Sequence, residues 1–319
     1  TLVAILDEQG HVLATGVGGP SNYDDVGAAV AQQNLAQAVE AARRAAHLDA
    51  QPFAAAFLGM AGVVSPQDRQ VIHQIAQALH LAAPDRTGVD HDCRIALAGG
   101  LTGRPGIVQI AGTGSSTFGM NAAGESWRSG GWGHLLADEG SGYWLGMQAM
   151  IAAVRSYDGR IPPSSLEERV LAALGLGDMN EIMHRLYVEQ LSRSEVARLG
   201  LLVIDAASAG DPYANTLIHR GCEEMADCVL AVARRLGLDG RPCELALVGG
   251  IFQAGAIVLQ PFTDAVQARL PHCRLTLAEL PPVLGAGVLA LQMLGIPIDE
   301  QVFAALQADA RAQAGASLG

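Results

Sequence analysis

The sequence contains no lysine, so all 20 residues counted as lysine or arginine are arginine. Several families of enzymes depend on a lysine side chain. P-loop enzymes place a lysine at the bound phosphates, protein kinases use a lysine on a strand, and Schiff-base enzymes need a lysine amine. The absence of lysine therefore excludes these three kinds of chemistry.

Aromatic residues and positive charge are also scarce. Aromatic side chains make up 4% of the chain, and 32 acidic residues outnumber 20 basic ones, which gives a formal net charge of −12. Nucleic acids bind clustered positive charge through their phosphates, and single strands also stack on aromatic rings. We therefore expect no nucleic-acid partner.

Cysteines are few and dispersed, and no segment has the pattern of a membrane span. The five cysteines form no CxxC pair, which is typical of reduced thiols in a cytoplasmic protein. The N-terminus lacks the basic and apolar regions of a secretion signal. The late apolar segment 283–298 is short for a bilayer and contains Gln292 and Pro297. The sequence predicts a soluble, cytoplasmic protein with no membrane partner.

Strand and helix patterns alternate along the chain, which predicts an α/β fold. The length of 319 residues suggests about two domains, and the 50% hydrophobic content is ample for their cores. Short apolar runs predict strands at 2–6, 11–17, 53–58, 87–89, 107–111, 117–120, 125–128, 244–248 and 275–277. Helical spacing predicts helices at 26–48, 66–79, 94–98, 141–155, 211–236, 285–294 and 301–312, with short helices within 166–199.

The two halves of the sequence begin with similar hairpin units. At an offset of 114 residues, Gly124 aligns with Gly10 and Gly130 aligns with Gly16. In the second unit, a strand and a glycine loop precede the hairpin, whereas the first unit starts directly at Thr1. We therefore expect the native N-terminus to lie upstream, with a first strand and a glycine loop missing from this chain.

The segment 130–146, with the sequence GGWGHLLADEGSGYWLG, contains two of the three tryptophans and six glycines. Glycine at this density lets the backbone approach a ligand closely, and Asp138 and Glu139 supply acceptors for hydroxyl groups. The same residues also suit the start of a helix, where acidic side chains complement the helix dipole. The residues alone leave both interpretations open.

The segment 130–146 resembles the sugar-binding motif of the N-acetylglucosamine kinase family, the BadF/BadG/BcrA/BcrD-type ATPases of the actin and hexokinase superfamily. The resemblance continues through 57–62, through 107–115, which is similar to the family's second phosphate loop, and through 247–252, which is similar to its adenosine motif. It implies two actin-like, ribonuclease H-like domains around a cleft. We expect the first domain at 1–104, together with the C-terminal helix 300–319, and the second at 105–299.

The resemblance implies an ATP-dependent kinase that phosphorylates the 6-hydroxyl of N-acetylglucosamine or a related amino sugar. From the residues alone, an aspartate at this place is interpreted as a helix cap, whereas by the resemblance Asp92 matches the family's catalytic base, which we favour. The neighbouring Asp90 is interpreted as a surface or turn residue. The matched sugar contacts are Asn22, Gly131, Trp132, Gly133 and Asp138. The matched ATP contacts are Gly112, Thr113, Gly114 and Ser115 at phosphate, and Ala207, Gly249 and Gly250 at the nucleoside.

The implied cofactors are ATP and Mg²⁺, with no metal ligand assigned to the protein and a homodimer as the expected assembly. The family's first phosphate loop should lie just before Thr1, so the chain as given is expected to lack part of the site. Two alternatives stay open. One is an ATPase that acts on a partner protein, and the other is a sugar-binding protein with impaired catalysis. The motif does not distinguish among the amino sugars.

Overall fold

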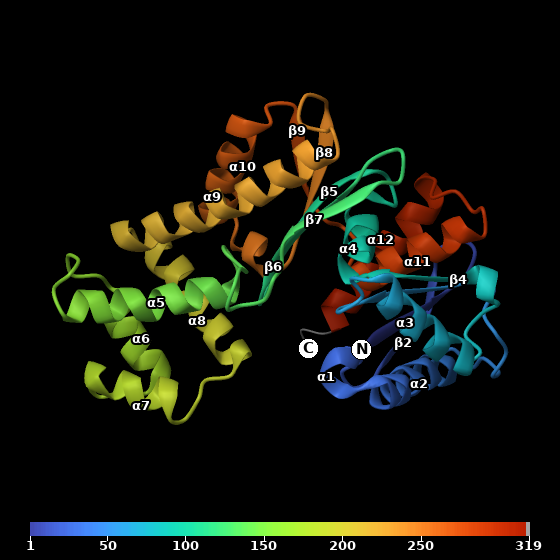
Figure 1. Ribbon diagram of the computed structural model, residues 1–319, viewed down its shortest axis with the longest axis horizontal. Coiled ribbons are helices and arrows are strands. Elements are labelled where there is room, and N and C mark those ends of the chain that lie inside the picture. The colour runs from blue at the N-terminus through green and yellow to red at the C-terminus, as the bar shows by residue number, and fades with distance from the viewer. Residues whose placement is uncertain (317–319) are drawn as a thin grey trace. The chain divides into compact units, whose positions relative to one another are not determined.

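The computed structural model of the chain describes residues 1–316 and divides into two compact units (Figure 1). Unit 1 combines Thr1–Arg104 with the segment from Ala278 onward, and unit 2 is Pro105–Leu277. Each unit has its own buried core, and the predicted α/β class is confirmed. Within the part of the chain that is described, no helix is both long and apolar enough to cross a membrane.

Unit 1 contains a hairpin and a separate parallel strand pair. The strands β1 (Leu2–Leu6) and β2 (Val12–Val17) pair antiparallel, while β3 (Ala56–Met60) and β4 (Thr87–His91) pair parallel. The helices are α1 (Tyr23–Val26), α2 (Ala28–Ala45), α3 (Pro66–Ala78), α4 (Asp92–Leu101), α11 (Pro282–Met293) and α12 (Glu300–Ala316), with the 3-10 turn η1 at Pro84–Arg86.

The helix boundaries follow local chemistry. α3 begins at Pro66, as predicted, because Ser65 and Asp68 form a reciprocal capping box at its N-terminus. The predicted helix 26–48 is interrupted at Gly27, which has a φ of +81° and separates α1 from α2. Because a φ in this region suits glycine and ends regular helix, the pattern of apolar residues alone could not place the break.

Helix α11 belongs to unit 1, which differs from the expected domain boundary. The second domain was expected to reach residue 299, but unit 2 ends at Leu277. The side chains of Leu284 and Val288 on α11 share a buried cluster with Ile95 of α4. A Cβ at Gly285 would lie 1.9 Å from the Ile95 carbonyl oxygen, so the two helix backbones approach closely. This contact between distant segments assigns α11 to unit 1.

An apolar cavity of about 900 Å³ lies inside unit 1. The strands β1 and β3 both line it, together with α11 and with Leu35 and Val39 of α2. Among residues 1–316, β1 pairs only with β2 and β3 pairs only with β4. Each of these two strands therefore has one edge without a neighbouring strand.

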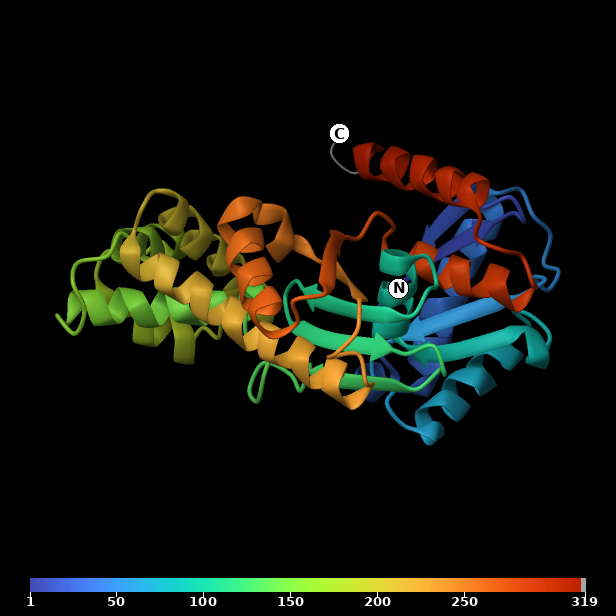
Figure 2. The ribbon, with the colours of Figure 1, turned by 90° about the horizontal axis from the view of Figure 1, so that it is seen from above.

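Unit 2 is built on a five-stranded sheet with the order β7-β6-β5-β8-β9. The strands β5, β6 and β7 are antiparallel neighbours, whereas β8 and β9 run parallel to β5. Figure 2 shows α9 running across the strands β5, β6 and β7. Their bounds are β5 (Gly106–Ala111), β6 (Ser115–Met120), β7 (Ser126–Gly130), β8 (Cys243–Val248) and β9 (Cys273–Leu277).

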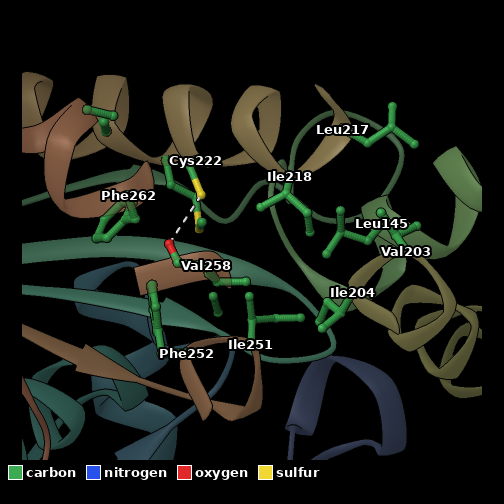
Figure 3. Packing of buried hydrophobic residues seen from close by; sticks show 14 of the residues in the cluster. Leu145, Val203, Ile204, Leu217, Ile218, Cys222, Ile251, Phe252, Val258 and Phe262 are labelled. Carbon is green, nitrogen blue, oxygen red and sulfur yellow. Dashed lines mark hydrogen bonds between the residues drawn. The ribbon is translucent and has the colours of Figure 1, made fainter. Parts of the chain in front are cut away.

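The helices of unit 2 form its core with one face of this sheet. They are α5 (Gly142–Tyr157), α6 (Leu166–Leu174), α7 (Ile182–Tyr187), α8 (Arg193–Ser208), α9 (Pro212–Arg235) and α10 (Ala256–Arg269), with 3-10 turns η2 (Met179–Glu181) and η3 (Gly250–Ala254). Figure 3 shows Cys222 of α9 facing α10, where its thiol donates to the Val258 carbonyl oxygen at 3.7 Å. Burial raises the pKa of Cys222 to about 12. This thiol is a core residue.

Helix α10 was not predicted from the sequence. Pro261 lies inside it and gives the segment the pattern of an interruption. The buried side chains Val258, Phe262 and Val266 nevertheless recur every fourth residue and face the core. Packing of this apolar stripe stabilises the helix despite the proline.

Candidate functional site

Asp92 lies where β4 ends and α4 begins. The N-cap residue of α4 is His91, whose Nδ1 atom accepts from the Cys93 backbone N–H at 3.2 Å. Asp92 is the first residue inside the helix, so the capping role considered from the sequence falls to its neighbour. Of the Asp92 side-chain surface, 47% is exposed.

The carboxyl group of Asp92 is held in its ionised form. Burial opposes ionisation, but the hydrogen bond and the charge of His91, with help from Cys93, outweigh it and keep the pKa of Asp92 below its usual value. The Nδ1 atom of His91 lies 2.7 Å from Oδ1 of Asp92. A carboxylate that is ionised and partly exposed can accept a proton from a hydroxyl group.

Asp90 has a different environment. Its Oδ1 atom accepts a hydrogen bond from the Arg69 guanidinium at 2.6 Å and another from the His91 backbone N–H at 2.8 Å. The carboxylate is thus occupied by an ion pair within unit 1. The Asp92 side chain is also more exposed than that of Asp90, at 47% against 22%.

Asn22 lies beside the segment that follows β3. It is the N-cap of α1, its Oδ1 atom lies 3.4 Å from the Asp24 N–H, and its Nδ2 atom donates to Asp25 at 2.8 Å. Gly62 has a φ of +85°, and a Cβ there would lie 2.5 Å from Asn22 Oδ1. The structure therefore brings Asn22 next to the end of the segment 57–62, which is also part of the resemblance, within unit 1.

In unit 2, the loop from Gly112 to Gly114 connects β5 with β6. The loop is closed by a hydrogen bond from Gly112 N–H to the Gly114 carbonyl oxygen at 2.9 Å. The first residues of α5 also bind the loop. Gly142 N–H donates to the Gly112 carbonyl oxygen at 2.8 Å, and Tyr143 N–H donates to the Thr113 carbonyl oxygen at 3.1 Å. Thr113 is exposed. The loop thus lies at a helix N-terminus, a position that favours bound anions.

Ser115 differs from the other residues expected at phosphate. It is the first residue of β6 and is 9% exposed. Its hydroxyl donates to the Glu139 carbonyl oxygen at 2.7 Å. This hydroxyl therefore ties the loop to the segment 130–146.

Trp132 lies at the surface of unit 2, between the partly exposed Gly131 and Gly133, whereas the later glycines of the segment 130–146 are buried. Trp132 is 67% exposed, and the Arg128 guanidinium lies 4.9 Å from the centre of its ring. Arg128 also donates to the Gly131 carbonyl oxygen at 3.2 Å. Gly131 has a φ of +67°, and a Cβ there would lie 2.7 Å from Ser116 Oγ, so this position requires glycine. Gly133 also has a positive φ, and a Cβ there would meet open space.

Asp138 lies inside this segment and is nearly buried. It is 3% exposed and has a φ of +67°, an uncommon backbone conformation for a residue with a side chain. Its Oδ1 atom accepts from Ser115 N–H at 3.3 Å, and its Oδ2 atom accepts from Arg193 at 2.7 Å. Asp138 therefore joins the segment 130–146 to the loop and to α8. Arg193 was not predicted, because 55 residues separate it from Asp138.

The nucleoside residues expected from the sequence lie in two places within unit 2. Gly249 follows β8 with a φ of +112°, and a Cβ there would lie 2.2 Å from the Ala111 carbonyl oxygen. The ends of β8 and β5 thus meet at the loop, and a Cβ at the adjacent Gly250 would meet open space. Ala207 lies on α8 and is 4% exposed, so its side chain belongs to the core.

A group of possible metal ligands is formed by His91, Asp92 and Cys93, whose ligand atoms lie within 4.8 Å of one another. These atoms are nitrogen, oxygen and sulfur. Mg²⁺ prefers oxygen ligands and is usually held by one or two carboxylates together with substrate phosphates and water. The group as a whole does not suit Mg²⁺.

Comparison with known proteins gives a consistent result. A family model described as the BadF/BadG/BcrA/BcrD ATPase family matches residues 1–290. The chain is 31% identical over 233 residues to an N-acetylmuramic acid/N-acetylglucosamine kinase from Clostridium acetobutylicum, covering 73% of this chain and 76% of the relative. It is 30% identical over 237 residues to an N-acetyl-D-glucosamine kinase from Dictyostelium discoideum, covering 73% of this chain and 74% of that protein.

A solved structure is also similar. It is that of a candidate N-acetylglucosamine kinase from Chromobacterium violaceum, with a TM-score of 0.67 and 30% sequence identity. The similarity covers 88% of this chain and 91% of the other. The chain thus shares the mixed α/β fold of this protein.

Proposed function

Because the chain belongs to the BadF/BadG/BcrA/BcrD ATPase family, we propose that it is an ATP-dependent kinase of N-acetylated amino sugars. The observation that carries the proposal is the loop Gly112–Gly114, held at the N-terminus of α5 and joined through Asp138 to the segment 130–146. A phosphate loop attached directly to the sugar-binding motif is suited to phosphoryl transfer. The names of the two relatives at about 30% identity support the same activity.

In the proposed reaction, Asp92 accepts the proton of the sugar hydroxyl as that hydroxyl attacks the γ-phosphate of ATP. The low pKa of Asp92 keeps the base deprotonated at neutral pH. The backbone N–H groups of Thr113 and Gly114 and the Thr113 hydroxyl bind phosphate oxygens. Mg²⁺, if bound together with ATP, would supply positive charge that offsets part of the phosphate charge. No lysine is needed for these steps.

The proposed substrate is N-acetylglucosamine or a close relative such as N-acetylmuramic acid, phosphorylated at the 6-hydroxyl. The names of the similar kinases motivate this choice. The proposed sugar residues are Asn22, Gly131, Trp132, Gly133 and Asp138. Because Asp138 is 3% exposed and already bonded to Arg193, its proposed part is to hold the sugar-binding backbone in place. Gly249 and Gly250 are the proposed nucleoside residues, and Ala207 contributes at most its backbone.

We also propose that the cavity of unit 1 receives a strand that lies ahead of Thr1. In unit 2, β5 lies between β6 and β8 and pairs with both, and it is joined to β6 by the loop Gly112–Gly114. In unit 1, the corresponding place between the hairpin and the parallel pair is the cavity. A strand there, followed by a glycine loop leading to Thr1, would complete the unit and supply a second phosphate loop.

The cytoplasmic location and the homodimer predicted from the sequence remain predictions. Sedimentation velocity would measure the assembly directly. Two alternative functions can be tested. A sugar-binding protein without catalysis would bind the sugar but would not phosphorylate it, whereas a kinase would. The partner-directed ATPase is distinguished by ATP hydrolysis that needs no sugar.

The central experiment is a kinase assay with ATP and a panel of N-acetylglucosamine, N-acetylmuramic acid, glucosamine and glucose. The protein is expressed with any residues encoded ahead of Thr1. We expect turnover with the N-acetylated sugars, and a loss of about 10²–10⁴-fold in the variant Asp92→Asn with its fold intact. Asp90→Asn is the matched control and should retain activity. Unchanged turnover in Asp92→Asn would refute the assignment of the base.

A further inference from the structure

Arg193, the first residue of α8, lies against the loop Gly112–Gly114. A Cβ placed on Gly114 would lie 2.6 Å from the Nη2 atom of Arg193 and 2.8 Å from Oδ2 of Asp138. The same Nη2 atom donates to Asp138 Oδ2 at 2.7 Å. The guanidinium group is therefore held beside the loop backbone at a defined place.

The two partners of this ion pair differ in exposure. The Asp138 side chain is 4% exposed, whereas the Arg193 side chain is 47% exposed. One nitrogen of the guanidinium is used by Asp138, and a guanidinium carries five N–H donors in all. Arg193 therefore has N–H donors exposed to solvent, whereas the carboxylate of Asp138 is buried and hydrogen-bonded.

The charge balance at the loop requires a positive group. The carboxylate of Asp138 accepts from the N–H of Ser115, which is the residue directly after the loop. A negative charge so close would repel a bound phosphate unless a cation neutralised it. The chain has no lysine, and Arg128, the basic residue next to the segment 130–146, stacks on Trp132. Arg193 is placed to supply the cation.

We propose that Arg193 binds the terminal phosphates of ATP at the loop Gly112–Gly114, an inference that rests on the proposed kinase function. Asp138 anchors one nitrogen of the guanidinium, and this anchoring directs the remaining N–H groups to phosphate oxygens. A planar guanidinium suits this task because it can donate two parallel hydrogen bonds to one phosphate.

A purely structural role for Arg193 makes a different prediction. If Arg193 only neutralised Asp138, removing both charges together would restore nucleotide binding. Removing Arg193 alone leaves a buried carboxylate unpaired, which can destabilise the fold. The double variant Asp138→Asn/Arg193→Met removes that penalty, so it reports on phosphate binding even where the single variant folds poorly.

The test is calorimetric titration of ATP and of adenosine in the absence of sugar. The proteins compared are the wild type, Arg193→Met, Arg193→Lys, the double variant and Arg198→Met, an exposed arginine on the same helix. We expect the Kd of ATP to rise about tenfold or more in Arg193→Met and in the double variant. The Kd of adenosine should not change, since adenosine has no phosphate. Arg193→Lys should recover part of the loss, and Arg198→Met should bind like the wild type.

Two results would overturn the inference and are distinguishable. Wild-type ATP affinity in the double variant, with normal binding by the wild-type protein, would show that Arg193 serves only to neutralise Asp138. A wild-type protein that binds neither ATP nor adenosine would refute the proposed kinase function, and the role of Arg193 with it.

Discussion

The Nδ1 atom of His91 lies 2.7 Å from the Oδ1 atom of Asp92, at the junction of β4 and α4. The same Nδ1 atom accepts from the Cys93 N–H as the helix cap, which requires its lone pair, and lowers the pKa of Asp92 when it carries a proton. Cap and ion pair therefore belong to different protonation states of His91, and the protonated state is the one that favours the ionised form of the proposed base.

Replacing His91 should change the pH dependence of turnover. In His91→Asn the cap can be retained, but the charge of the imidazole is lost, so the pKa of Asp92 should rise. A general base must be deprotonated to accept a proton. The acidic limb of the plot of kcat against pH should therefore move to higher pH. Steady-state kinetics across the acidic range measures this shift. Asp90→Asn is the control, and the proposal fails if it moves the limb as much as His91→Asn does.

Gly112, in the proposed phosphate loop, and Gly249, which lies beside that loop, should respond differently to alanine. A Cβ at Gly112 meets nothing within 4 Å, so Gly112→Ala should change the free energy of unfolding by no more than about 0.5 kcal/mol. The added methyl group should instead weaken ATP binding by occupying space needed for phosphate. At Gly249 the φ of +112° and the 2.2 Å approach to Ala111 predict a loss of about 2–4 kcal/mol. Chemical denaturation and ATP titration separate the two effects.

The hydrogen bond from the Tyr23 hydroxyl to Asp68 should make stability depend on alkaline pH. The bond to Asp68 is the main reason that the pKa of Tyr23 is raised from 10.0 to about 12. A group whose pKa is raised by folding stabilises the protein below its unfolded pKa and loses that contribution as pH rises through its folded pKa. The stability difference between wild type and Tyr23→Phe should therefore be constant below pH 10 and shrink towards pH 12.

Urea unfolding at a series of pH values measures that difference. Tyr187→Phe is a suitable control, because Tyr187 is 66% exposed and its substitution should leave the alkaline profile of the wild type unchanged. Equal profiles for Tyr23→Phe and wild type up to pH 12 would show that the bond does not contribute.

Filling the cavity of unit 1 should stabilise it. A copy of the chain's own Gly106–Gly114, fused directly ahead of Thr1, supplies an apolar strand and a glycine loop in the order found in unit 2. Pairing with the free edges of β1 and β3 should raise the Tm by several degrees, since about 1 kcal/mol corresponds to about 2–4 °C in a domain of this size. The control carries proline in place of Val108 in the copy. Equal Tm values for the two fusions would argue against strand insertion.

Local sequence patterns were sufficient for much of the fold and for the loops of the site. The strands predicted at 2–6 and 11–17 are present as β1 and β2, and the helix beginning at Pro66 is present as α3; turn glycines, apolar runs and capping residues predicted them. The family membership expected from the segment 130–146 is confirmed by the match over residues 1–290. These features depend on short-range backbone preferences, which neighbouring residues determine.

Tertiary structure decided the features that join distant parts of the chain. Arg193 meets Asp138 across 55 residues, α11 packs on α4 within unit 1, and the hairpin and the parallel pair of unit 1 leave a cavity between them. No local pattern encodes which buried carboxylate an arginine will reach or which helix will share a core. The sequence by itself determined the family, most of the strands and helices, and the candidate residues. Long-range packing and charge pairing determined which of those residues are exposed and which are held in place.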